Sequence, residues 1–82
     1  MKVVYFARLR ESVGLSEEII EKPVDVNTAG ELKDWLAARG EPFQSALSGA
    51  RVLMAVDQEH AQADSDISTC SEVAFFPPVT GG

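Results

Sequence analysis

The sequence predicts an α+β domain in which a mixed sheet of four to five strands is covered on one face by one main helix. Two observations support this prediction. Short β-branched and aromatic segments open and close the chain, at residues 2–8 and 72–76, and two further strand candidates lie between them. A single segment, residues 28–39, has the spacing of apolar side chains that is typical of an amphipathic helix.

Two strands are expected before the helix. Residues 2–8 form the first, and residues 9–16 are too short and too polar for more than a helical turn that Gly14 ends. Residues 17–26 form a second, shorter strand that turns back onto the first. Pro23 ends the hydrogen-bond ladder of this strand because proline has no amide hydrogen.

The helix has its own start and stop signals. Thr28 and Glu31 fit a capping box, in which each side chain bonds the backbone amide of the other residue. Gly40 is suited to the left-handed conformation that ends many helices. The apolar stripe, which we expect to be buried, consists of Ala29, Leu32, Trp35 and Leu36.

Three segments follow the helix. Residues 41–50 are expected to be a connection with a single helical turn held by Phe43 and Leu47. Residues 51–56 read as a third strand, and residues 57–64 as a turn with a short edge strand.

The chain ends with a polar loop at residues 64–71, anchored by Ile67, and a last strand at residues 72–76. The first and last strands are continuous apolar runs, so we expect them to lie side by side in the middle of the sheet. The resulting order, β-β-α-β-(β)-β, with one main helix is that of the β-grasp, or ubiquitin-like, fold.

Alternation along the strands sorts their residues into two faces, because a single covering helix buries only one face. Lys2, Arg51 and Glu72 fix the phase, since charged side chains should point outward. The inward set is Val3, Tyr5, Ala7, Val52, Met54, Val56, Val73 and Phe75. The outward set holds four large apolar side chains, Val4, Phe6, Leu53 and Phe76, as well as Ala55 and Ala74. A monomer rarely leaves such a patch in water, so we interpret the four as partner-binding residues; cover by a loop, or a wrong phase in one strand, is the alternative.

Composition limits the class of protein. The 82 residues suffice for one domain, and 45% hydrophobic with 24% charged residues is usual for a globular protein. The longest apolar runs are too short to span a bilayer, and the start lacks the features of a signal peptide. A single cysteine fits a reducing compartment. We therefore expect a cytoplasmic protein that does not bind membranes.

The charge argues against nucleic acid as a partner, because a net charge of −6 repels phosphate backbones. The charge is uneven along the chain: residues 1–40 hold six bases and seven acids, whereas residues 41–82 hold one base and six acids. The half that ends in the C-terminus is thus the acidic half. We interpret this excess mainly as a source of solubility; the alternative is steering toward a basic partner surface.

The segment that ends the chain, "FFPPVTGG", separates a body from a tail. Pro77 and Pro78 donate no amide hydrogen, so strand pairing should stop at Phe76. Two consecutive prolines favour extended backbone, which directs the exit away from the sheet. We expect a domain at residues 1–76 and an extended, flexible tail at residues 77–82, through Val79 and Thr80.

The last two residues, Gly81 and Gly82, lack side chains and can enter a channel too narrow for other residues. The terminal carboxylate is the one reactive group in the tail. A carboxylate is a poor acyl donor, but if another protein converts it to an acyl-adenylate, a nucleophile can attack the Gly82 carbonyl with little hindrance. The tail is therefore interpreted as a carrier of a transferable group.

The ending "EVAFFPPVTGG", at residues 72–82, resembles that of the small subunit of molybdopterin synthase, a family of ubiquitin-like sulfur carriers. Weaker similarity covers the whole chain, in "KVVYFARLRE" and around the helix in "AGELKDWLAA". The resemblance implies that a ubiquitin-activating-like adenylyltransferase, using ATP and Mg²⁺, adenylates Gly82, and that a persulfide donor protein supplies the sulfur of a thiocarboxylate.

The resemblance also implies the partner and the acceptor. The tail would insert into the synthase large subunit of a heterotetramer and pass its sulfur to cyclic pyranopterin monophosphate; the large subunit would supply the catalytic groups. The family contact surface maps onto Phe6 and Phe76, although the turn near His60 is polar where relatives tend to be apolar. Two other functions stay open: a sulfur carrier for the thiazole of thiamine or another acceptor, and a protein modifier that joins Gly82 to lysines.

Other candidate sites are weak. Cys70 has no neighbour in the sequence that would lower its pKa, and the acids near it would raise that pKa, so we expect no redox role. His60 lacks the spacing of metal ligands and is expected to be a surface residue. No pair of nucleophile and base is evident, so the chain alone is expected to catalyse nothing and to bind no cofactor or metal.

Overall fold

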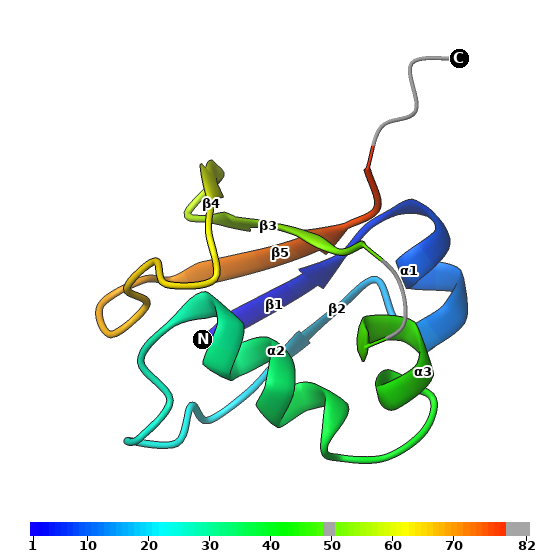
Figure 1. Ribbon diagram of the computed structural model, residues 1–82, viewed down its shortest axis with the longest axis horizontal. Helices are drawn as coiled ribbons and strands as arrows, with labels where there is room; N and C mark the ends of the chain where they lie inside the picture. The colour runs from blue at the N-terminus through cyan, green and yellow to red at the C-terminus, as the bar shows by residue number, and fades with distance from the viewer. Residues whose placement is uncertain (49–50, 79–82) are drawn as a thin grey trace.

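The computed structural model describes residues 1–48 and 51–78 and has the predicted α+β, β-grasp architecture. A mixed five-stranded sheet has the order β2-β1-β5-β3-β4. The strands are β1 (Lys2–Tyr5), β2 (Glu17–Ile19), β3 (Leu53–Val56), β4 (Glu59–Ala61) and β5 (Glu72–Phe76). The helices are α1 (Ala7–Val13), α2 (Ala29–Ala37) and α3 (Phe43–Ser48). Helices α2 and α3 lie on one side of the sheet, and α1 lies at its end (Figure 1).

The first and last strands lie side by side in the middle of the sheet, as predicted. They run parallel, with Val3 opposite Val73 and Tyr5 opposite Phe75. Strand β2 pairs antiparallel with β1, which confirms the expected return of the second strand onto the first. Strand β3 pairs antiparallel with β5 and carries the short edge strand β4. The first and last strands of the chain are therefore neighbours at the centre of the sheet.

The core lies between the sheet and the helices. Its large, fully buried side chains are Tyr5, Phe75, Leu32, Leu36, Leu47, Ile67, Val3 and Val73. Burial of Ile67 confirms it as the anchor of the polar loop. Each such side chain contributes about 1.5–3 kcal/mol when it is removed from water, so this face of the sheet accounts for much of the stability.

Helix α2 begins as the sequence predicts. The Glu31 amide donates to Thr28 Oγ1 at 3.2 Å, and the Thr28 amide donates to Glu31 Oε1 at 3.0 Å, which completes the capping box. These bonds hold the pKa of the Glu31 carboxyl below its usual range, chiefly because the backbone amides of Asn27 and Thr28 donate to it. Gly40 follows the helix at φ 96°. A substitution of Thr28 would leave one of these amides without its partner.

The first strand is shorter than predicted, and the segment after it is more helical. Ala7, expected to point inward on a strand, is exposed and begins α1 instead, with φ 52°. Leu9 and Val13, four residues apart, are both buried, so α1 has an apolar stripe that sustains seven residues rather than one turn. Gly14 ends α1 in the left-handed region, at φ 83°, as predicted.

The helical face of the sheet is also covered more widely than predicted. Besides α2, residues 43–48 form the six-residue helix α3 in place of a single turn. Three residues expected in the core, Val52, Val56 and Trp35, are only partly buried and pack against its margin. Strand β3 lies next to the edge strand, and Trp35 lies at the margin of α2, so these side chains keep some contact with water.

A polar cluster holds β2 against the helices. Arg39 donates two hydrogen bonds to Glu18, at 3.1 and 2.8 Å, and its guanidinium lies 4.1 Å from the centre of the Phe43 ring and 5.5 Å from that of Trp35. The hydroxyl of the buried Tyr5 donates to the same carboxylate at 2.7 Å. The partial exposure of Trp35 follows from this arrangement, because its indole supports a charged group at the surface.

None of the helices in the described part of the chain is long and apolar enough to cross a membrane.

Candidate partner-binding surface and C-terminal segment

The face of the sheet that the helices leave uncovered carries apolar side chains that lie opposite one another on neighbouring strands. Val4 on β1 lies opposite Ala74 on β5, and Ala74 lies opposite Ala55 on β3. In the next row Phe76 lies opposite Leu53, while the Phe6 amide donates to the Phe75 carbonyl at 3.1 Å and continues the parallel pairing. We call the set Val4, Phe6, Leu53, Ala55, Ala74 and Phe76 the outer patch.

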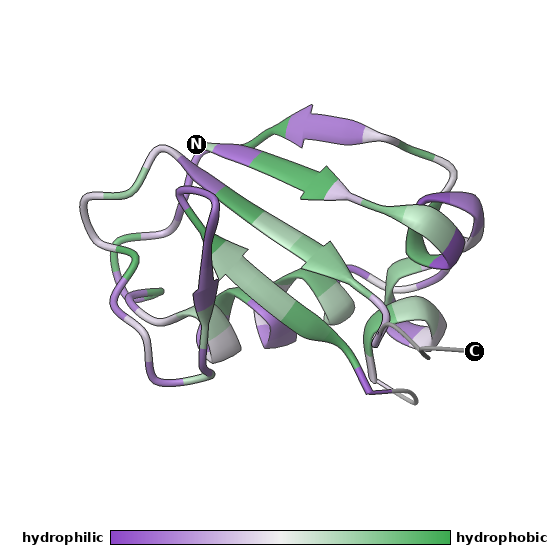
Figure 2. Ribbon diagram, turned by 90° about the horizontal axis from the view of Figure 1, so that it is seen from above, coloured by the Kyte–Doolittle hydropathy of each residue, from purple (hydrophilic) through white to green (hydrophobic). Residues whose placement is uncertain are grey.

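The structure thus brings together all four predicted partner-binding residues on one surface. Phe6 is 48% exposed, and Val4, Leu53 and Phe76 are partly buried. Ala74 points to the outer face as predicted but is only 5% exposed, because Val4 and Ala55 lie on either side of it. No described loop covers the outer patch: the three strands that carry it are the green strands at the centre of Figure 2, flanked by purple β2 and β4.

The outer face is charged at one end of the central strands and apolar at the other. At the ends of β1 and β5 where those strands begin, Lys2 lies 3.8 Å from a Glu72 oxygen and 3.9 Å from a Glu17 oxygen. At the ends where β1 and β5 finish, the side chains are apolar. The apolar half of the face is therefore next to the start of the C-terminal segment.

Strand β5 ends at Phe76, the residue before Pro77, as the missing amide hydrogens require. Pro77 and Pro78 follow it outside any regular element and are partly buried. The four remaining residues of the proposed tail, Val79, Thr80, Gly81 and Gly82, lie outside the described residues.

His60 belongs to the same face. The residue pattern alone indicated only a surface residue, whereas the family resemblance had placed the turn near His60 at the edge of the contact surface. It lies opposite Ala55 across the β3–β4 pairing, and its ring centre is 6.0 Å from that of Phe76. The side chain is exposed, so it forms a polar edge to the outer patch. Alternation along residues 59–61 would have placed it there once the register of the edge strand was known.

The remaining reactive side chains do not form a catalytic centre. Burial, followed by the charge of Asp57, raises the pKa of the Cys70 thiol, so this thiol is a weak nucleophile at neutral pH. The upward shift of the Cys70 pKa matches the sequence prediction, although burial is a larger cause of the shift than the charge of a nearby acid. Within residues 1–48 and 51–78, no group of three or more His, Cys, Asp or Glu side chains could hold a metal ion.

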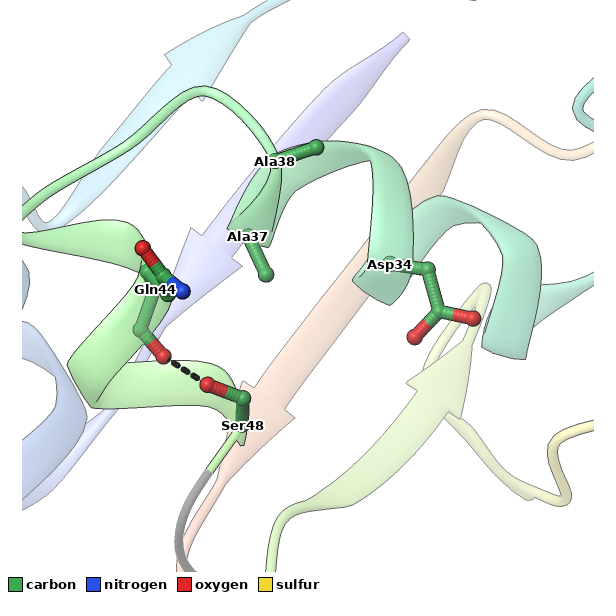
Figure 3. Close-up of a pocket in the computed structure, with 5 residues that line it drawn as sticks. All are labelled: Asp34, Ala37, Ala38, Gln44 and Ser48. Atoms are coloured by element: carbon green, nitrogen blue, oxygen red, sulfur yellow. Dashed lines mark hydrogen bonds between the residues drawn. The ribbon is translucent and has the colours of Figure 1, made fainter.

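A shallow hollow lies between α2 and α3, on the side of the molecule away from the outer patch (Figure 3). It measures about 320 Å³ and is lined by Asp34, Ala37, Ala38, Gln44 and Ser48. The Ser48 hydroxyl donates to the backbone carbonyl of Gln44, so it is already engaged. With one carboxylate and no base beside a nucleophile, the hollow has no arrangement for acid–base or nucleophilic chemistry.

Comparison with known proteins gives a consistent result. The model of the ThiS family matches residues 3–82. The molybdopterin synthase sulfur carrier subunit of Escherichia coli K12 is 39% identical over 82 residues, which is 100% of this chain and 99% of that protein. The corresponding subunit of Haemophilus influenzae is 35% identical, with the same coverage.

Two solved structures share the fold. A putative molybdopterin converting factor, subunit 1, from Pyrococcus furiosus superposes with a TM-score of 0.75 at 30% identity, covering 95% of each chain. SAMP1 from Haloferax volcanii superposes with a TM-score of 0.72 at 25% identity, covering 99% of this chain and 97% of that one.

Proposed function

We propose a function from the premise that this chain belongs to the ThiS family: it is the sulfur carrier subunit of a molybdopterin synthase, in the biosynthesis of the molybdenum cofactor. Relatives of that name match its whole length. The observation that carries the proposal is the outer patch, because an apolar surface beside the start of the C-terminal segment suits a subunit whose end is held by a partner.

The body and the tail have separate tasks in this proposal. Residues 1–76 form the rigid docking domain, and residues 77–82 form an extended tail that reaches into the partner. From Pro77, six residues span at most about 20 Å when fully extended, which is enough to reach a channel in a neighbouring subunit. Gly81 and Gly82 pass a narrow channel because they have no side chains.

The sulfur chemistry occurs at the carboxylate of Gly82. An adenylyltransferase of the ubiquitin-activating type, using ATP and Mg²⁺, joins the carboxylate to AMP and releases pyrophosphate. A persulfide on a donor protein attacks the acyl carbon and displaces AMP, which leaves an acyl disulfide. A thiol then reduces the sulfur–sulfur bond and leaves the thiocarboxylate on Gly82, ready to give its sulfur to cyclic pyranopterin monophosphate.

The partner that receives the tail is the large subunit of the synthase. Four large side chains, Val4, Phe6, Leu53 and Phe76, would be removed from water on docking, at about 1.5–3 kcal/mol each before the losses of association are subtracted. The large subunit supplies the acceptor pocket and the proton-transfer groups. We propose that the complex is a heterotetramer in the cytoplasm.

The decisive experiment removes Gly82. The truncated chain still ends in glycine, at Gly81, but its carboxylate is one residue closer to the body, so we expect sulfur transfer to be abolished while the melting temperature is unchanged. The measurement is conversion of cyclic pyranopterin monophosphate to molybdopterin by the reconstituted synthase. A truncated chain that still matures molybdopterin would overturn the proposal.

Intact-mass spectrometry separates the sulfur carriers from the third function. Exchange of one terminal oxygen for sulfur, after incubation with the activating enzyme, ATP and a persulfide donor, supports a carrier. Gly82 attached to a lysine of another protein supports the modifier. Co-purification with the synthase large subunit then distinguishes molybdopterin synthesis from thiazole synthesis.

A further inference from the structure

In the folded chain, most acids of the second half lie at one end of the sheet and two exposed arginines lie at the other. The order of residues along the chain does not show this separation. Most acids of the second half lie at the end of the sheet where β1 and β5 begin, far from the C-terminal segment. Asp57, for example, accepts hydrogen bonds from the Ser71 and Glu72 amides, at the start of β5. The acids of this region are Asp57, Glu59, Asp64, Asp66 and Glu72. In Figure 1, strand β4, the loop that follows it and the start of β5 lie toward the left, away from the end at which β5 finishes.

The end of the sheet where the C-terminal segment starts carries arginines instead. Arg8, in α1, comes two residues after Phe6. Arg51 comes two residues before Leu53, which lies opposite Phe76, so Arg51 lies at the end of the sheet where β5 finishes. Both side chains are exposed.

These two arginines form no ion pair with any described residue, in contrast to Lys2 and Arg39, which pair with glutamates. The charge of an exposed cation without an ion-pair partner is not offset by a nearby anion, so it can attract an acidic partner surface. A paired cation is largely neutralised by its anion. The apolar outer patch therefore ends, at the exit of the C-terminal segment, in a basic rim made by Arg8 and Arg51.

We propose that this basic rim docks against acidic side chains on the large subunit, placed around the entrance that receives the tail. The inference rests on the proposed function and adds the charge of the partner surface. It reverses the alternative drawn from the sequence, in which the acidic second half steers the tail toward a basic surface. The second half of the chain is acidic, but five of its six acids lie at the far end of the sheet, whereas its one base, Arg51, lies at the end where β5 finishes.

The charge separation would also orient the approach of the two subunits. An acidic entrance attracts the rim and repels the acids at the far end of the sheet. The end of the domain that carries the tail therefore faces the partner as the two subunits approach. Such steering acts on the association rate more than on the lifetime of the complex, and raises the rate by about 10- to 1,000-fold where the fields are strong. Salt weakens it, because the Debye length falls from about 30 Å at 0.01 M to about 3 Å at 1 M.

The test reverses one charge at a time. Arg8→Glu and Arg51→Glu each change the net charge by two units, and Lys33→Glu is a control with the same change on α2, away from the outer face. The full chain of each variant is mixed with the purified large subunit, and the association rate is measured in about 0.01 M and about 1 M salt. Arg51→Gln, which removes the charge without reversing it, should give an intermediate rate.

At low salt we expect each arginine reversal to slow association by about ten-fold, whereas Lys33→Glu changes it by less than about two-fold. At high salt the variants should converge with the unmodified chain. Arginine variants that associate as fast as Lys33→Glu at low salt, or faster than the unmodified chain, overturn the inference and leave the proposed function standing. An unmodified chain that does not bind the large subunit overturns the proposed function, and the inference with it.

Discussion

Phe75 and Phe76 are adjacent on β5 and chemically identical, yet the fold uses them differently. Phe75 is fully buried on the inner face, with its ring centre 6.1 Å from that of Tyr5. Phe76 points to the outer face, where its aromatic neighbour is the exposed His60. The two faces of the sheet are therefore both apolar, but only one is closed by this chain. Apolar content alone does not distinguish a core from a docking surface; the distinction is which face the helices cover.

The difference between the two phenylalanines is tested by replacing each with alanine in turn. Phe75→Ala leaves a cavity among fixed neighbours and should reduce the free energy of unfolding by about 3–5 kcal/mol. Phe76→Ala removes a side chain that water already reaches, and should reduce it by less than about 1 kcal/mol. Chemical denaturation measures both. Equal losses for the two variants would show that the outer face is as much a core as the inner one.

A second prediction concerns the contribution of the outer patch to partner binding. Phe6→Asp and Phe76→Asp place a charge in the outer patch and should weaken binding to the large subunit by about 2 kcal/mol or more, or roughly 30-fold. Titration calorimetry gives the affinity. Val24→Asp is a matched control, because Val24 is the most exposed large apolar residue in the described chain, at 89%, and lies away from the patch.

The same variants should keep their melting temperatures close to that of the unmodified chain. A large drop in melting temperature for Phe6→Asp or Phe76→Asp would identify these residues as core. Unchanged affinity in both variants would instead remove the outer patch from the interface.

A smaller effect is expected at the border of the inner face, where Tyr5 and Arg39 share the Glu18 carboxylate. Burial, and then the hydrogen bond to Glu18, raises the pKa of the Tyr5 hydroxyl well above its usual value near 10. Burial opposes ionisation of Glu18, but the hydrogen bonds from Arg39 and Tyr5 outweigh it and lower its pKa. Tyr5→Phe keeps the ring and removes the hydroxyl, and should cost about 1 kcal/mol at neutral pH.

The pH dependence of that loss has a definite sign. Since the folded state raises the pKa of Tyr5, the stability it contributes is fully present below the unfolded pKa near 10 and is lost as pH rises above it. The pKa of Glu18 is lowered, so its contribution is present above the unfolded value near 4.3 and is lost as pH falls below it. Unfolding free energies of the unmodified chain and Tyr5→Phe should converge in alkali. A difference that stays constant to the highest pH would exclude a contribution from the Tyr5 proton.

Much of this molecule could be predicted from short-range patterns. Thr28 and Glu31 indicated the start of α2 because a capping box involves only four consecutive residues. Alternation from Glu72 correctly assigned Val73 and Phe75 to the core, because the side-chain period of a strand is two. The four apolar residues of the predicted partner surface do lie together on the uncovered face.

Other predictions failed where packing between distant segments decides the outcome. Ala7 was expected on a strand, yet the chain bends there because Leu9 and Val13 find a buried place at the end of the sheet as a helix. Trp35 was expected in the core, but its position at the margin of α2, under Arg39, leaves it partly exposed. Single-sequence periodicity does not contain these contacts.

By itself, the sequence determined the order of the strands, the main helix α2 and the two faces of β1, β3 and β5, because those properties depend on residues a few positions apart. The tertiary structure alone decided which face stays open and that His60 lies beside Phe76. It also decided that five of the six acids of the second half lie at the opposite end of the sheet from Arg51. The reason is the central parallel pair β1–β5, which places the first and last strands side by side and so sets distances in space that separation along the sequence does not reveal.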